Sequence, residues 1–123
     1  PLIMGLMGAV NELPNAEMQL KKQQELFCFA AEKLSALKGT VINSPQGCLP
    51  YILNISLPGY RSETLLHFLE SRDIFVSSGS ACAKGHGSYV LNEMGLSRYN
   101  TKEDIILLCE ALSDAVKQIR RAN

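Results

Sequence analysis

The sequence lacks the features that mark several large classes of protein. No run approaches the roughly 18 consecutive apolar residues of a membrane span, and the opening Pro1-Leu2-Ile3-Met4 has no basic flank, so it is not a secretory signal. Twelve basic residues balance twelve acidic ones and the formal net charge is zero, so neither nucleic acid nor an anionic membrane is indicated as the main partner. The chain also lacks an initiator methionine, which predicts that it begins inside a longer protein.

The four cysteines lack the spacing that zinc sites and thioredoxin-type motifs need, because no Cys-x-x-Cys pair is present. Such scattered thiols are typical of reduced cysteines in the cytoplasm, where we expect this protein. Cys28 and Cys109 fall inside helical patterns and are predicted to be small core residues. Cys48 is predicted to be an incidental thiol in a loop. Only Cys82 has a setting that suggests chemistry.

The spacing of apolar residues predicts an α/β domain, in which a small sheet is packed by helices. A chain of 123 residues can form one domain with a modest core. Period-3.6 and period-2 patterns separate the elements. We expect helices at 2–13, at about 16–38 with Gly39 as terminator, at 62–72, at 88–95 and at 101–119, and strands at 40–43, 51–57 and 74–77.

Each predicted element has an expected buried side. Ser62 and Ser88 are expected to cap their helices, and Thr101 with Asp104 resembles a capping box. The helical spacing of Leu2, Leu6, Ala9, Val10 and Leu13 predicts the first helix. The residues expected on the buried sides of the later elements are Leu20, Phe27, Ala30, Ala31, Leu34 and Leu37; Tyr51, Leu53, Ile55 and Leu57; Leu65, Leu66 and Leu69; Val90, Leu91 and Met94, with Gly95 as a stop; and Ile105, Leu108, Leu112, Ala115 and Ile119, with Val116 beside them.

The most unusual stretch runs from Phe75 to Ser88, where apolar residues lead into a run of small ones around Cys82. Gly79 and Gly85 allow backbone conformations that a side chain would forbid. The small neighbours leave the thiol uncrowded, whereas a structural cysteine usually packs against large apolar side chains. This composition predicts a strand that leads into a loop displaying Cys82.

That loop carries a resemblance to a known family. Ser77-Ser78-Gly79-Ser80-Ala81-Cys82, followed by Ser88-Tyr89-Val90-Leu91-Asn92-Glu93-Met94-Gly95-Leu96, resembles the active-site loop of cysteine desulfurases, which are pyridoxal-phosphate enzymes of the class V aminotransferase type. The order of elements resembles their C-terminal small domain, as in fold-type I transferases. The resemblance implies that residues 1–123 are this single domain, without the large cofactor-binding domain, and that Cys82 accepts sulfur.

The resemblance also implies a reaction and partners. In the family, L-cysteine forms a Schiff base with pyridoxal phosphate, which serves as an electron sink. The loop thiolate then attacks the substrate sulfur, so that a persulfide forms on Cys82 and alanine is released. A sulfur-acceptor protein and a homodimer are expected. The acceptor route stays open (iron–sulfur cluster assembly, transfer-RNA thiolation or another), as does the choice between cysteine and selenocysteine.

Two departures from the family pattern stand out. The cofactor lysine lies on the large domain, nothing here resembles that segment, and Lys84 does not replace it, so this chain alone is expected to be inactive and not to bind the cofactor. Relatives also insert a strand between Leu96 and Ser97 that bears the arginine for the substrate carboxylate. Either the strand is deleted, or the numbering closes over a missing segment, which we favour. Arg98 matches a different family position.

Other interpretations of the same residues remain open. His86 is expected to be an exposed loop imidazole rather than a catalytic group, and a zinc site formed by Cys82 and His86 would have too few ligands. The main alternative is a non-catalytic module that relays sulfur or mediates dimerisation and is inactive without a partner. A redox-sensing role for Cys82 would need an accessible thiol of low pKa and no cofactor.

Overall fold

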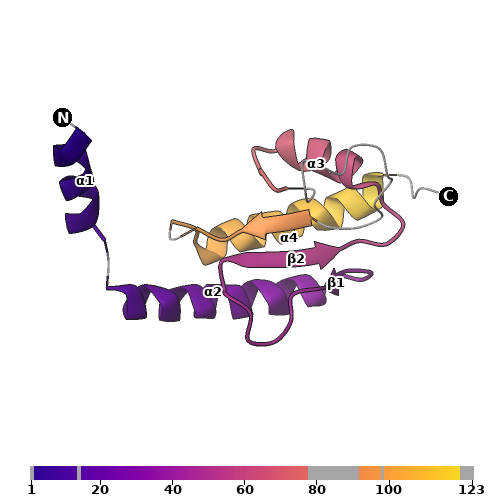
Figure 1. Cartoon of the computed structure of the whole chain (residues 1–123). Coiled ribbons are helices and arrows are strands. Elements are labelled where there is room, and N and C mark those ends of the chain that lie inside the picture. The colour runs from indigo at the N-terminus through magenta and orange to yellow at the C-terminus, as the bar shows by residue number, and fades with distance from the viewer. Residues whose placement is uncertain (1, 14, 78–91, 98, 120–123) are drawn as a thin grey trace.

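The computed structural model describes residues 2–13, 15–77, 92–97 and 99–119, and of residues 92–94 only the backbone. The elements follow the order α1 (Leu2–Asn11), α2 (Ala16–Ser35), β1 (Val41–Ile42), β2 (Ile52–Ser56), α3 (Ser62–Glu70), β3 (Asn92–Gly95) and α4 (Lys102–Gln118). Figure 1 shows α4 alongside the strands, α2 and α3 to either side, and α1 apart from them. The predicted α/β class, a small sheet packed by helices, agrees with this arrangement.

The sheet has three antiparallel strands in the order β1-β2-β3. β2 is central because Val41 pairs with Ser56 on one side and Gly95 pairs with Ile52 on the other. The predicted alternation along this strand is confirmed at Leu53, Ile55 and Leu57, which are buried. The prediction is wrong for Tyr51, which is exposed just before the strand, and for Ser56, which was expected on the opposite face but is buried.

The core lies where α2, α3 and α4 meet the buried face of β2. α4 packs against both α2 and α3. Its predicted stripe is confirmed at Ile105, Leu108, Leu112 and Ala115, and Ala111, which was not predicted, is buried with them. Ile119 lies at the C-cap and is only partly buried. The largest apolar side chains with almost no exposed surface come from four different elements and are Leu34, Leu53, Ile55, Leu65, Leu69 and Leu112.

Helix α2 departs from the predicted stripe and from its predicted end. Its buried residues are Gln23, Leu26, Ala30 and Leu34, while Leu20 is exposed. The helix ends at Ser35, and a turn follows in which the Thr40 amide donates to the Leu37 carbonyl at 3.1 Å. Gly39 closes this turn with φ of 93°, a conformation that glycine adopts without steric cost.

The N-cap of helix α3 lies one residue earlier than predicted. Arg61 holds the N-cap position without a side-chain hydrogen bond, so Ser62 is the first helical residue and does not cap. Leu65 and Leu69 are buried as expected, and Leu66 is half-buried.

Two predicted elements are wrong in the described residues. The predicted strand 74–77 is not part of the sheet, and only Ser77 takes part in an isolated β-bridge. The predicted helix 88–95 is a strand at Asn92–Gly95, paired with β2. Pairing explains the second change, because it satisfies backbone groups of β2 that would otherwise form an open sheet edge. Residues 88–91, including Val90 and Leu91, lie outside the described part of the chain.

Candidate functional site

The predicted sulfur acceptor, Cys82, lies outside the residues that the structure describes, as do Lys84, His86 and Arg98. Their roles therefore remain predictions. It describes the chain on either side of this segment, up to Ser77 and from Asn92 onward. The candidate site is built here from those flanking residues.

The N-terminal flank is held by the end of α3. The Ile74 amide donates to the Leu69 carbonyl at 3.0 Å, and Asp73 turns the chain with φ of 59°. The guanidinium of Arg72 lies 4.3 Å from the centre of the Phe68 ring and donates to Asp114 of α4 at 3.1 Å. The cation–π contact holds Arg72 against α3, and the ion pair attaches this flank to α4.

The C-terminal flank is anchored by hydrogen bonds to β2 and α2. The Leu96 amide donates to the Tyr51 carbonyl at 2.7 Å. Gln23, which is 1% exposed, donates through Nε2 to the Leu96 carbonyl at 2.9 Å. A buried amide is retained only when it is hydrogen-bonded, so this bond explains why a glutamine stands on the apolar side of α2.

Helix α4 begins a few residues after the C-terminal flank. Thr101 and Asp104 form the predicted capping box, with the Thr101 amide donating to Asp104 Oδ2 at 2.9 Å and the Asp104 amide to Thr101 Oγ1 at 3.4 Å. The Ser97 amide donates to Asn100 Oδ1 at 2.7 Å. Leu96 is joined directly to Ser97 in this sequence, and both explanations of the junction, a deleted strand and a missing segment, stay predictions.

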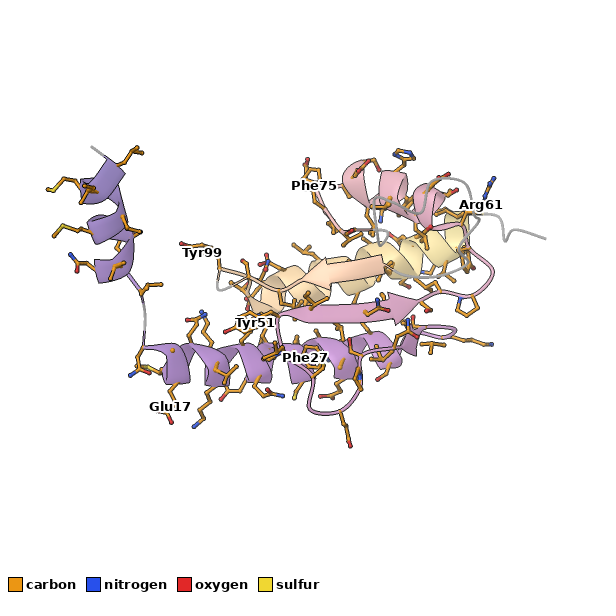
Figure 2. All side chains as sticks on the ribbon, viewed as in Figure 1. Glu17, Phe27, Tyr51, Arg61, Phe75 and Tyr99 are labelled. Atoms are coloured by element: carbon orange, nitrogen blue, oxygen red, sulfur yellow. The ribbon has the colours of Figure 1, made fainter. Side chains whose placement is uncertain are left out.

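A groove of about 710 Å³ lies between the two flanks and α4. Its apolar lining includes Ile74, Leu107 and Phe75, and the Phe75 ring is 78% exposed. Figure 2 shows Phe75 at the outer edge of the α3 side of the molecule. Carboxylates outnumber basic groups along the groove, since four acidic residues and one arginine line it: Asp73, Asp104, Glu110, Asp114 and Arg72.

The three cysteines in the described residues differ in exposure. Cys28 is exposed on α2, so its prediction as a core residue is wrong. Cys48 is half-buried in a loop, as expected for an incidental thiol. Cys109 packs against the core, and burial raises the pKa of its thiol, while Lys33 lowers it and Glu110 raises it. A raised pKa leaves less thiolate at neutral pH, so Cys109 is a poor nucleophile.

The described ranges contain no cluster of side chains that could bind a metal ion. No three side chains of His, Cys, Asp or Glu gather there where they could hold an ion. His67 is exposed on α3 and lies 3.1 Å from Glu70 of the same helix.

Comparison with known proteins identifies the family to which the chain belongs. The family model described as aminotransferase class-V matches residues 1–108. The chain belongs to the class V aminotransferase family. The mitochondrial cysteine desulfurase of Saccharomyces cerevisiae is 31% identical over 139 positions, which cover 98% of this chain. The cysteine desulfurase IscS of Clostridium botulinum is 35% identical over 119 positions, which cover 72%.

Solved structures show the same fold. A NifS-like protein superposes with a TM-score of 0.71 at 22% identity and covers 84% of this chain. The cysteine desulfurase CsdA of Escherichia coli superposes with a TM-score of 0.73 at 18% identity and covers 86%. At these identities the likeness establishes the fold of this class V chain.

The chain spans less than a third of the length of these relatives, 27% of the yeast protein and 30% of the Clostridium protein. The yeast alignment has 139 positions although the chain has 123 residues, so the relative carries residues that this chain lacks. This agrees with the direct junction of Leu96 and Ser97. None of the helices in the part that the structure describes is long and apolar enough to cross a membrane.

Class V aminotransferases use pyridoxal phosphate, and the described residues do not form a site for it. A cofactor lysine must project into an enclosed site. The described lysines are instead exposed at the surface, and Lys33 and Lys102 lie over the Phe29 ring at 5.5 and 5.3 Å. The remaining ones, also exposed, are Lys21, Lys22, Lys38 and Lys117.

The residues that hold the flanks were not predicted from the sequence. The ion pair of Arg72 with Asp114 joins positions 42 apart, and the bond of Gln23 to Leu96 joins positions 73 apart. A glutamine among apolar residues at helical spacing was the one available signal. It indicates a buried polar group but does not name its partner.

Proposed function

We propose that this chain is the C-terminal small domain of a pyridoxal-phosphate-dependent cysteine desulfurase, and that Cys82 receives the sulfur of L-cysteine. The large domain with the cofactor lysine is not part of these 123 residues. The chain alone is therefore expected to be inactive. In the intact enzyme we expect a homodimer that passes sulfur to an acceptor protein, in the cytoplasm as the scattered cysteines suggest.

One observation carries the proposal. The yeast relative, which is named cysteine desulfurase, aligns along 98% of this chain, and the aligned stretch includes the Ser77–Cys82 motif. The thiols of the described residues support the same assignment by their settings. Cys28 is exposed in the middle of a regular helix, while Cys109 is partly buried with a raised pKa. The raised pKa makes Cys109 a poor nucleophile at neutral pH.

The proposed reaction transfers one sulfur atom from L-cysteine to the protein. The carbon–sulfur bond of L-cysteine breaks and a sulfur–sulfur bond forms at Cys82, so the products are an enzyme persulfide and alanine. The thiolate of Cys82 is the nucleophile, because a thiol must lose its proton to attack sulfur. The described residues contribute the anchored flanks of the segment that carries it.

The test is persulfide mapping in the intact enzyme that contains this domain. After incubation with L-cysteine, mass spectrometry should find the persulfide on Cys82. Cys82→Ser should retain the bound cofactor and lose alanine production by orders of magnitude, because a hydroxyl is a far weaker nucleophile than a thiolate. Cys28→Ser, which changes an exposed thiol, is the control and should keep full turnover. A persulfide on Cys48, or normal turnover of Cys82→Ser, would contradict the proposal.

The isolated chain provides a second test. Mixed with pyridoxal phosphate and dialysed, it should keep no visible absorbance from a lysine-bound cofactor and should make no alanine from cysteine. Stable absorbance together with turnover would show that these 123 residues contain a complete active site.

A non-catalytic sulfur-relay or dimerisation module is the second candidate. The direct junction of Leu96 and Ser97 favours it, since the carboxylate-binding strand that the resemblance predicts is absent. A relay would accept sulfur on Cys82 from a persulfide donor even when no cofactor domain is present. Incubation of the isolated chain with a low-molecular-weight persulfide, followed by transfer to an acceptor thiol, distinguishes the two functions.

A further inference from the structure

Strand β3 ends the sheet, and none of the described strands lies along its outer edge. Its pairing with β2 shows which backbone groups face that edge. The Leu96 amide donates to the Tyr51 carbonyl, and hydrogen bonding alternates along an antiparallel pair. The backbone groups of Met94 therefore face β2 as well, while those of Glu93 and Gly95 point away from it. An open edge of this kind can pair with a further strand.

Gly95 places this open edge on the lining of the groove of about 710 Å³. Gly95 is exposed, and a Cβ added to it would meet nothing of the described chain within 4 Å. Residues 74–76 line the groove as well and are not part of the sheet. Figure 1 shows β2 on one side of β3 and α3, from which residues 74–76 continue, toward the other. An extended backbone laid along the outer edge of β3 would therefore lie in this groove.

The groove offers apolar contact to such a segment from two elements. Phe75 is 78% exposed, and Leu107 of α4 is 57% exposed. The neighbouring lining residues Ile105 and Leu108 are buried in the core, so they fix the position of α4 under the groove. Apolar side chains of a bound segment would remove the surfaces of Phe75 and Leu107 from water, which favours binding.

The charged side chains of the groove favour a basic occupant. Four carboxylates and one guanidinium line it. Arg72 is paired with Asp114, and Asp104 belongs to the capping box. Asp73 and Glu110 are exposed, and neither forms an ion pair with another described residue. Two carboxylates are thus left for lysine or arginine side chains of a partner, and charge complementarity of this kind selects between partners.

We propose that this groove binds an extended segment of a partner protein, in which apolar residues alternate with lysine or arginine, and that the segment pairs with the outer edge of β3 as a fourth strand. Successive side chains of a strand point to opposite faces, so the alternation gives the segment an apolar side for Phe75 and Leu107. The long stems of the basic residues carry their charges to Asp73 and Glu110. Backbone bonds to Gly95 supply affinity, and the side chains supply selectivity. Binding here does not require the chemistry proposed for Cys82.

The probe is a synthetic hexapeptide of alternating lysine and valine, blocked at both ends and labelled with a fluorophore. Its anisotropy is measured on titration with this chain. We expect saturable one-to-one binding that weakens as salt is added, because exposed charges are screened. The same peptide with glutamate in place of lysine is the charge control and should bind at least about 10-fold more weakly.

Two measurements distinguish strand pairing from charge attraction alone. The Gly95 amide should exchange its hydrogen at least about 10-fold more slowly in the complex, while the Leu96 amide, already bonded to Tyr51, should change little. Lysine–valine peptides are also N-methylated at every second amide, in the two possible registers. Only alternate amides of an added strand point to β3, so one register should weaken binding at least about 10-fold through lost hydrogen bonds, and the other should bind normally.

A pair of variants tests the edge from the side of the protein. Gly95→Pro removes the outward amide hydrogen, and proline is tolerated on an edge strand where that group faces solvent. It should weaken binding at least about 10-fold. Gly95→Ala keeps the amide, has room for its Cβ and should bind normally. If Gly95→Pro does not fold, the two methylated peptides test the same hydrogen bonds on the unaltered chain.

A second pair of variants tests the charges. Asp73→Asn with Glu110→Gln should weaken binding at least about 10-fold and reduce its salt dependence. Asparagine tolerates the φ of 59° at Asp73. Glu12→Gln with Glu25→Gln removes the same charge at exposed positions that do not line the groove and should bind normally.

Three results would overturn the proposal. The first is binding that leaves the exchange of the Gly95 amide unchanged, because the peptide would then lie elsewhere. The second is equal binding of the lysine–valine and glutamate–valine peptides, which would mean that the groove does not select basic segments. The third is a homodimer of this chain, seen by light scattering during gel filtration, that pairs through β3 and excludes the peptide.

Discussion

Helices α1 and α4 both repeat apolar residues at steps of three and four, yet the fold covers only α4. α4 buries Ile105, Leu108 and Leu112 along one stripe and exposes charged residues opposite. α1 buries nothing. The difference teaches that period alone predicts a helix, while the polar residues between the apolar ones indicate how much of the helix its own domain can enclose.

The largest expected effect is at the centre of the α4 stripe. Leu112 is 1% exposed, so Leu112→Ala should lower the free energy of unfolding by about 2–5 kcal/mol through lost burial and a remaining cavity. A denaturant melt measures this. A loss below about 0.5 kcal/mol, the usual range for a surface position, would mean that α4 is no better covered than α1.

A smaller effect is expected at the start of α4. Thr101→Ala removes the acceptor of the Asp104 amide and should cost about 1 kcal/mol, the typical value for an N-cap. Thr64→Ala, at an exposed position inside α3, is the matched control and should cost nothing measurable by the same thermal melt. Equal melting temperatures of the two variants would show that the capping box does not stabilise the helix.

The matched change in α1 should be nearly silent. Leu6 is 66% exposed, so Leu6→Ala should change the free energy of unfolding by less than about 0.5 kcal/mol, as usual for surface substitutions. The denaturant melt used for Leu112→Ala applies directly. A loss of about 2 kcal/mol or more, the lower limit for core leucines, would show that α1 packs within the isolated chain.

The smallest effect is a pH dependence at Cys109 on the flank of α4. Burial raises the pKa of this thiol above its ordinary value of 9.0, so the folded state keeps a proton that the unfolded state loses first. Stability should therefore fall as the pH rises above about 9. Cys109→Ala should flatten this dependence, and the wild-type thiol should alkylate more slowly in the native chain than in denaturant at pH 8.5. Equal rates would place Cys109 in solvent, as for Cys28.

Local signals were sufficient for much of the fold. Thr101 with Asp104 predicted the start of α4, and the alternation of Leu53, Ile55 and Leu57 predicted β2 with its buried side. Both patterns act within a few residues, where capping and the pleat of a strand are decided. The small residues around Cys82 led to the candidate site in the same way, and its chemistry remains a prediction.

Longer-range effects changed the rest. Residues 92–95 were expected to be helical, but they pair with β2, because a strand edge without a partner leaves backbone groups unsatisfied. Gln23 was not expected inside, but the Leu96 carbonyl, 73 positions away, gives its amide a partner. Cys28 and Leu20 were expected inside, but both are exposed, since none of the described elements covers that side of α2.

The sequence by itself determined the four helices α1 to α4, the central strand β2 and the capping of α4, since these depend on neighbours within one or two turns. Only the tertiary structure decided which apolar faces are covered, that 92–95 becomes a strand, and that Arg72 and Gln23 anchor the two flanks of the Cys82 segment. These outcomes depend on which groups, distant in the sequence, come into contact in the fold. The free-energy cost of burying a polar group cannot be judged until its partner is known.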